Sequence, residues 1–109
     1  TGDLPEMKSA MAVELGKGPA VKVMDRSVIC TPAVVDALEQ AAKDCGVSAQ
    51  REILLCGGTD TSALQKARAG VQAGAVSIPT RYIHSPSELC AVSDVEDAAK
   101  LLAQYALRK

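Results

Sequence analysis

The sequence predicts an α/β fold in which short buried strands form a mainly parallel sheet covered by amphipathic helices. Three observations support this class. A helical pattern of apolar residues follows Thr31, a continuous apolar run occupies residues 52–56, and a second strand pattern at 73–78 lies beyond another short helical pattern. A strand, a helix and a strand so close together are near the minimum for a parallel crossover unit.

The composition fits one globular domain. The chain has 109 residues, of which 48% are hydrophobic and 23% are charged, and its net charge is −1. This balance provides no basic excess for binding a nucleic-acid backbone, and no apolar run approaches the roughly 20 residues of a membrane span. We therefore expect no nucleic acid and no membrane among its partners. The sequence contains neither Phe nor Trp, so the core must be aliphatic.

The N-terminal segment and the cysteines predict a cytoplasmic protein. Residues 1–5 lack the basic and apolar segments of a signal peptide. The chain begins with Thr1 and no initiator Met, which suggests a processed product or a fragment of a longer protein. The cysteines have no short zinc-ligand spacing and are expected to be buried thiols in a reducing compartment: Cys30, Cys45, Cys56 and Cys90.

The first predicted elements are two strands and a helix. Residues 10–14 and 20–24 are apolar and flank a Gly/Pro-rich joint, which favours a hairpin. Alternation around Lys22 indicates that the second strand is half-buried. The helix follows Thr31 as the N-cap and Pro32 as its first residue. It ends before Gly46, and its apolar face comprises Val34, Val35, Leu38, Ala41, Ala42 and Cys45.

The second half of the chain predicts a crossover and a last helix. A strand at 52–56 leads to a helix opened by Thr59 or Asp60 and ended by Gly70, and a strand at 73–78 follows. The last helix is predicted to start at Ser93, because Ser93 and Glu96 have capping-box spacing. Its apolar stripe comprises Val95, Ala98, Ala99, Leu102 and Ala106.

Two segments follow the predicted strands at the edge where parallel sheets bind ligands: residues 57–60 and residues 79–86. The pair Gly57-Gly58 would let a ligand approach the backbone closely, and the helix start would offer N–H groups to an anion. An ordinary strand-to-helix turn, capped by Thr59 or Asp60, explains the same residues equally well.

The remaining candidate residues are weaker signals. His84 is the only histidine and suits metal binding or acid–base chemistry, although a lone histidine more often has neither role. Arg81 could bind a carboxylate, but a solvated charge is favoured. A Cys56–His84 nucleophile and base is disfavoured, because Cys56 ends an apolar strand and should pack in the core. Asp60 and Glu88 make no convincing glycosidase pair.

Residues 51–60 (REILLCGGTD) and 76–85 (VSIPTRYIHS) resemble the C-terminal part of the glutamyl/tetrahedral aminopeptidase family. These proteins are co-catalytic metallopeptidases, some of them described as cellulase- or endoglucanase-like. Residues 15–27 and Asp94-Val95-Glu96 resemble the same family, so the likeness covers nearly the whole chain in order. The resemblance implies a three-layer αβα portion of a zinc-peptidase-like catalytic domain with a mainly parallel sheet.

The resemblance also implies roles for individual residues. His84 would bind one of two divalent metal ions, zinc or cobalt. Arg81 would support the site or the subunit contacts. The substrate pocket would be lined by Gly57, Gly58, Thr59 and Asp60. The family's other ligands and its glutamate base lie N-terminal to the matched region, and Asp3 is assigned to none of them. We therefore expect no catalytic residue in this chain. Thr61-Ser62 replaces the family's usual Ala-Gly, which affects the pocket's shape.

The sequence thus predicts residues 1–109 to be the C-terminal portion of a metallo-aminopeptidase catalytic domain. The parent would hydrolyse N-terminal residues from oligopeptides and form a homo-oligomer. This chain alone would be inactive and would not retain the two divalent metal ions. Two alternatives remain open: a non-enzymatic truncated scaffold or assembly subunit, and an endoglucanase-like hydrolase.

Overall fold

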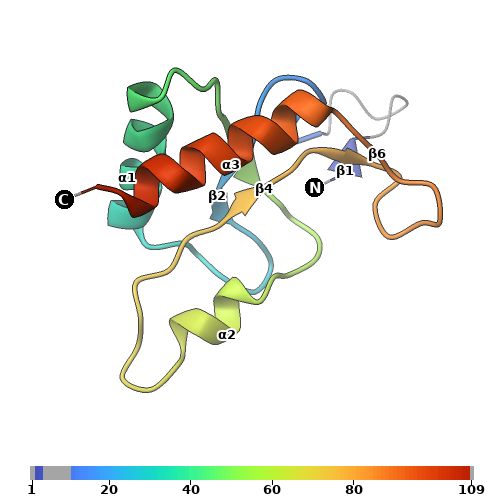
Figure 1. The fold of residues 1–109 in the computed structure, drawn as a ribbon. Coiled ribbons are helices and arrows are strands. Elements are labelled where there is room, and N and C mark those ends of the chain that lie inside the picture. The colour runs from blue at the N-terminus through green and yellow to red at the C-terminus, as the bar shows by residue number, and fades with distance from the viewer. Residues whose placement is uncertain (1, 4–10, 109) are drawn as a thin grey trace.

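The computed structural model describes residues 2–3 and 11–108. Three helices and two small sheets make up this part of the chain (Figure 1). The helices are α1 (Pro32–Asp44), α2 (Thr61–Gln65) and α3 (Val92–Ala106). The first sheet contains β2 (Ala20–Met24), β3 (Gln50–Ile53) and β4 (Val76–Ser77). The second sheet contains β1 (Gly2–Asp3), β5 (Thr80–Arg81) and β6 (Leu89–Cys90).

The first sheet has β2 at its centre, with a parallel neighbour, β3, and an antiparallel neighbour, β4. The α/β class is therefore confirmed, but the predicted parallel crossover between the strands at 52–56 and 73–78 is wrong. The helix between them, α2, has only five residues, and loop residues make up the rest of the connection. It stops well before Gly70, because both Arg68 and Gly70 adopt positive φ angles that a helix excludes.

Helix α1 confirms its prediction closely. Pro32 is its first residue, and Gly46 adopts a φ of 70° just beyond its end. Thr31 occupies the N-cap position but does not cap the helix with its side chain. Its hydroxyl oxygen instead accepts a hydrogen bond from the Ala73 backbone N–H at 3.0 Å. Thr31 therefore connects the start of α1 to the irregular segment that leads into β4.

Helix α3 differs from its prediction at the N-terminus. It begins at Val92, with Ala91 as the N-cap, so Ser93 lies inside the first turn and forms no capping box. Its buried face contains Ala98 and Leu101, rather than the predicted Leu102, which is 47% exposed. Helices α1 and α3 pack against each other, and α1 also packs on β2.

The core between α1, α3 and the β2 sheet is aliphatic, as the composition requires. Its buried members are Val21, Val28, Cys30, Val35, Leu38, Ala42, Val47 and Leu101. Burial of Cys30 is confirmed, and it raises the pKa of that thiol. Cys56 and Cys90 are exposed, so the expectation that Cys56 packs in the core is wrong. The chain leaves β3 at Ile53, and the rest of the apolar run, 54–56, turns toward the surface.

The segment before β2 is a loop rather than the predicted strand. Residues 11–19 contain no strand, so the hairpin prediction is wrong for the described residues, and Ala10 lies outside them. The loop is held from a distance. Asp94 accepts hydrogen bonds from the backbone N–H groups of Gly16 at 2.7 Å and Gly18 at 3.0 Å. Within residues 2–3 and 11–108, no helix combines the length and the apolar character needed to cross a bilayer.

Candidate functional site

The glycine turn at 57–60 packs against the turn that follows β2. The Arg26 backbone N–H donates to the Gly57 carbonyl oxygen at 3.1 Å. A Cβ atom on Gly58 would lie only 2.8 Å from Ser27 Oγ, so a larger residue would have to displace the Ser27 hydroxyl, and this close approach favours glycine. Gly57 has a φ of 87°, which also favours glycine. The two glycines thus have a structural explanation, and their contact with a ligand stays a prediction.

Asp25 is the centre of this contact. Its side chain is buried, and one carboxylate oxygen accepts hydrogen bonds from Ser27 N and Ser27 Oγ, both at 2.7 Å, and from Val28 N at 3.1 Å. The other oxygen accepts from Thr59 Oγ1 at 2.9 Å. Burial by itself would raise the pKa of Asp25. The hydrogen bonds from Ser27 and Thr59 and the charge of Lys22 outweigh burial, so the pKa lies below its ordinary value.

Lys22 joins Asp25 to a second buried carboxylate. Its Nζ lies 2.8 Å from Glu52 Oε2 and 3.9 Å from Asp25 Oδ2. The Ser77 hydroxyl donates to the same Glu52 oxygen at 2.7 Å. All three charged residues are at most 2% exposed. We refer to Lys22, Asp25, Glu52, Thr59 and Ser77 as the buried charge cluster.

Sequence reasoning missed the buried charge cluster. Alternation around Lys22 predicted a half-buried strand, yet the face of β2 that carries Lys22 is as buried as the face that carries Val21. The available signal was Glu52, a charged residue at the start of an otherwise apolar run. Lys22 and Glu52 are direct register partners in the parallel β2–β3 pair, and the sequence does not reveal that pairing.

His84 lies in the loop that connects β5 and β6, two strands of the second sheet. Its side chain is exposed, and its backbone N–H donates to Glu88 Oε1. Tyr82 and His84 adopt φ angles of 55° and 62°, in the left-handed region that non-glycine residues rarely occupy. Arg81 is half-buried at the end of β5. Glu88 therefore closes a loop whose backbone is strained at Tyr82 and His84 and whose His84 imidazole is exposed.

The structure groups the predicted site residues in two places. Gly57, Gly58, Thr59 and Asp60 share one turn, which is held by the turn after β2. Arg81 and His84 share the β5–β6 hairpin, in a different sheet. These two segments are the ones expected to meet at one sheet edge. Because β4 runs antiparallel to β2, that expected edge of parallel strands does not form.

A metal centre needs more ligands than the described residues supply. Among them, no group of three or more His, Cys, Asp or Glu side chains could hold a metal ion. The carboxylates of Asp25 and Glu52 are already engaged by Lys22 and by hydroxyl donors. The described residues do not form a metal site by themselves. The exposed imidazole of His84 could supply one ligand to a site completed by other residues.

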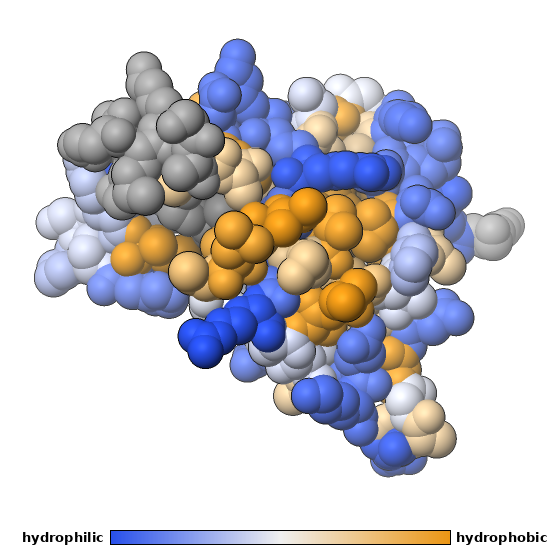
Figure 2. Space-filling model, turned by 180° about the vertical axis from the view of Figure 1, so that it is seen from behind, coloured by the Kyte–Doolittle hydropathy of each residue, from blue (hydrophilic) through white to orange (hydrophobic). Residues whose placement is uncertain are grey.

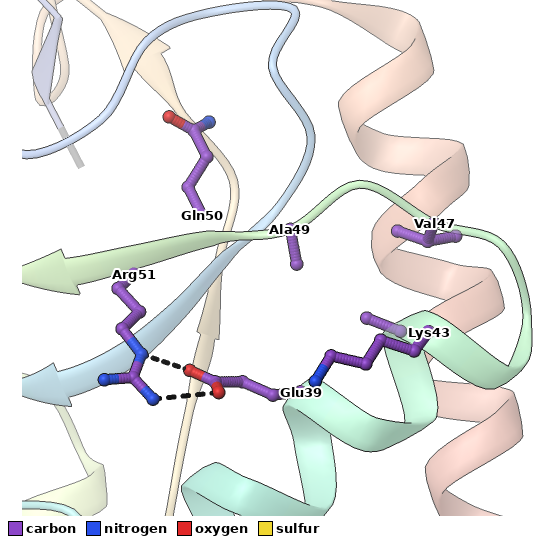
Figure 3. A pocket seen from close by; sticks show the side chains of 7 residues that line it. Glu39, Lys43, Val47, Ala49, Gln50 and Arg51 are labelled. Carbon is purple, nitrogen blue, oxygen red and sulfur yellow. Dashed lines mark hydrogen bonds and ion pairs between the residues drawn. The ribbon is translucent and has the colours of Figure 1, made fainter.

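Among the pockets that the described residues line, two lie elsewhere on the surface. The first, of about 270 Å³, lies between the end of α1 and β3 and has Lys43, Ala49 and Val47 in its lining (Figure 3). The Arg51 guanidinium forms a bidentate ion pair with Glu39 across it, and the hydrogen bond from Arg51 lowers the pKa of Glu39. The second, of about 360 Å³, is largely apolar and lies between α1, α2 and α3. Neither pocket contains a predicted site residue.

Comparison with known proteins gives a consistent assignment. The sequence matches the M42 glutamyl aminopeptidase family over residues 1–101. A candidate aminopeptidase of Acetivibrio thermocellus is 48% identical over 104 residues, which cover 95% of this chain and 31% of that protein.

Two solved structures share the fold. Aminopeptidase APDkam598 of Desulfurococcus kamchatkensis superposes with a TM-score of 0.88 at 36% identity, covering 98% of this chain and 31% of that one. The TET1 peptidase of Pyrococcus horikoshii, which can assemble into a tetrahedron or a large octahedral shell, gives 0.80 at 32% identity, covering 89% and 28%. The chain thus spans less than a third of the length of these three relatives. It belongs to the M42 glutamyl aminopeptidase family.

Proposed function

We propose that residues 1–109 form the C-terminal portion of the catalytic domain of a metal-dependent aminopeptidase that removes N-terminal residues from oligopeptides. Membership of the M42 family over residues 1–101 supports the peptidase assignment. In such a domain the parallel β2–β3 pair would belong to a larger, mainly parallel sheet between two helical layers. The edge position of β3 in the first sheet is compatible with such an extension.

His84 is the residue of this chain to which we assign metal binding, and its conformation is the observation that carries the proposal. A non-glycine residue at a φ of 62° costs on the order of 1–2 kcal/mol. Such strain concentrates at functional sites, where the surrounding structure holds it. Here Glu88 binds the His84 backbone N–H and leaves the imidazole exposed. A neutral imidazole nitrogen is a good ligand for zinc or cobalt.

The other residues of the chain would shape the pocket. Gly57, Gly58, Thr59 and Asp60 would form part of its wall, and Arg81 would support the site or a subunit contact. A pair of divalent ions, when bound by the complete site, polarises the peptide carbonyl and lowers the pKa of a bridging water. With a single histidine and no ligand cluster among the described residues, this chain would not hold such a pair, since a catalytic zinc takes three protein ligands.

A chimera tests the role of His84. Residues 1–101 would replace the matching segment of the Acetivibrio thermocellus relative, to which this chain is 48% identical over 104 residues. We expect His84→Ala in the chimera to lower metal affinity at least tenfold, as measured by metal stoichiometry and by the visible absorption of the cobalt form. Glu88→Gln is the matched control, because it alters the same loop without removing a nitrogen ligand. Unchanged metal content in the His84 variant would show that this residue is no ligand.

The chain by itself is expected to be inactive. An assay with aminoacyl p-nitroanilide substrates in the presence of added zinc or cobalt measures this directly. Turnover that depends on the 109-residue chain would contradict the proposed division of the site.

We also propose that the chain takes part in a homo-oligomer. The TET1 relative assembles into large shells, and several large apolar side chains of this chain are exposed, including Leu55, Val92 and Leu107. Figure 2 shows apolar residues gathered in a patch on the back of the molecule. Size-exclusion chromatography with light scattering tests this, and a strictly monomeric species at all concentrations would count against it.

A further inference from the structure

The buried charge cluster connects the two segments that the proposed pocket requires. On one side, Thr59 Oγ1 donates to Asp25 at 2.9 Å, which fixes the end of the glycine turn. On the other side, Ser77 Oγ donates to Glu52 at 2.7 Å, which fixes β4. Only Ile78 and Pro79 separate β4 from β5, where the His84 hairpin begins.

Lys22 is the part of this cluster that faces both carboxylates. Its ammonium lies 2.8 Å from Glu52 and 3.9 Å from Asp25. With side chains at most 1% exposed, neither ion pair is screened by solvent. One ammonium between two buried carboxylates supplies both with a compensating positive charge, in addition to their hydrogen bonds from hydroxyl and backbone donors.

We propose that Lys22 is a positioning residue whose buried ammonium couples the glycine turn to β4 and the hairpin that follows, so that both sides of the pocket keep one relative position. The inference rests on the proposed function only in treating the two segments as parts of one pocket. The coupling itself is a property of this chain and is measurable without any bound metal.

A double-mutant cycle measures the coupling. Thr59→Val and Ser77→Ala each remove one hydroxyl at opposite ends of the cluster, and neither residue bonds to the other. Distant, independent sites have additive effects within about twofold in the unfolding equilibrium constant. We expect the combined effect of the two changes to differ from the product of their separate effects by threefold or more. The control cycle pairs Thr59→Val with Asp97→Ala, on the surface of α3, and should be additive.

Two further measurements separate positioning from simple stabilisation. In a Lys22→Met background, the cycle should become additive within twofold. If that variant does not fold, amide hydrogen exchange replaces it: Thr59→Val should accelerate exchange at Val76 and Ser77, and Asp97→Ala should not.

Additive effects with Lys22 present, a coupling that survives Lys22→Met, or unchanged exchange in β4 would each overturn the proposal. None of these results depends on the metal content of the chimera. Failure of the His84 test and failure of the Lys22 test are therefore distinguishable.

Discussion

Asp94 offers the sharpest test of how this fold is held together. Its carboxylate is 1% exposed and accepts backbone hydrogen bonds from Gly16 and Gly18, at 2.7 and 3.0 Å, from a loop far away in the sequence. Hydrogen bonds to a charged group contribute about 1.5–3 kcal/mol each. Loss of both hydrogen bonds in Asp94→Ala should therefore lower the free energy of unfolding by about 3 kcal/mol. This corresponds to an increase of roughly a hundredfold in the unfolding equilibrium constant.

Asp97 provides a matched control on the same helix. Its carboxylate pairs with Lys100 at the surface, where the two side chains are 29% and 59% exposed, and such pairs contribute about 0–1 kcal/mol. Urea unfolding followed by circular dichroism at 222 nm suits a protein without Trp. Asp94→Asn retains one acceptor oxygen and should fall between wild type and Asp94→Ala. The reasoning would be refuted if Asp94→Ala cost less than about 1 kcal/mol or no more than Asp97→Ala.

Three further outcomes are expected. The pKa of Asp25 is lowered in the folded protein. Its contribution to the free energy of unfolding is therefore fully present above the unfolded pKa of about 3.9 and is lost as the pH falls through the lower folded pKa. The stability gap between wild type and Asp25→Asn, measured by urea unfolding, should accordingly narrow between pH 6 and pH 3. A Cβ on Gly18 would lie 1.7 Å from the Ser48 carbonyl oxygen, whereas one on Gly46 meets nothing within 4 Å. Gly18→Ala should thus prevent folding or cost well over 3 kcal/mol, against about 1 kcal/mol for Gly46→Ala, and equal melting temperatures would contradict this. Finally, His84→Gly should raise the free energy of unfolding by about 0.5–1 kcal/mol by relieving its backbone strain, whereas His84→Ala should not; a destabilised glycine variant would argue against strain at this position.

The family could be inferred from sequence because its signals are contiguous. Residues 76–85 and residues 51–60 are short continuous strings, and the match to the M42 family over residues 1–101 confirms the family that they suggested. The roles of these residues could not be settled in the same way. From the sequence, Gly57 and Gly58 fitted both a ligand site and an ordinary tight turn. Only the structure shows the close contact of Gly58 with Ser27, which explains this glycine by packing.

The sequence by itself determined the elements whose pattern repeats within one window: the span of α1 with its Pro32 start, the strand β2, and the existence of α3. Tertiary structure alone decided how these elements pair and which charges become buried. β4 pairs antiparallel with β2 instead of completing a parallel crossover, Lys22 is buried against Glu52, and Asp94 binds the loop at Gly16 and Gly18. The physical reason is that periodicity reports on neighbours along the chain, whereas the compensation of a buried charge depends on groups that only folding brings together.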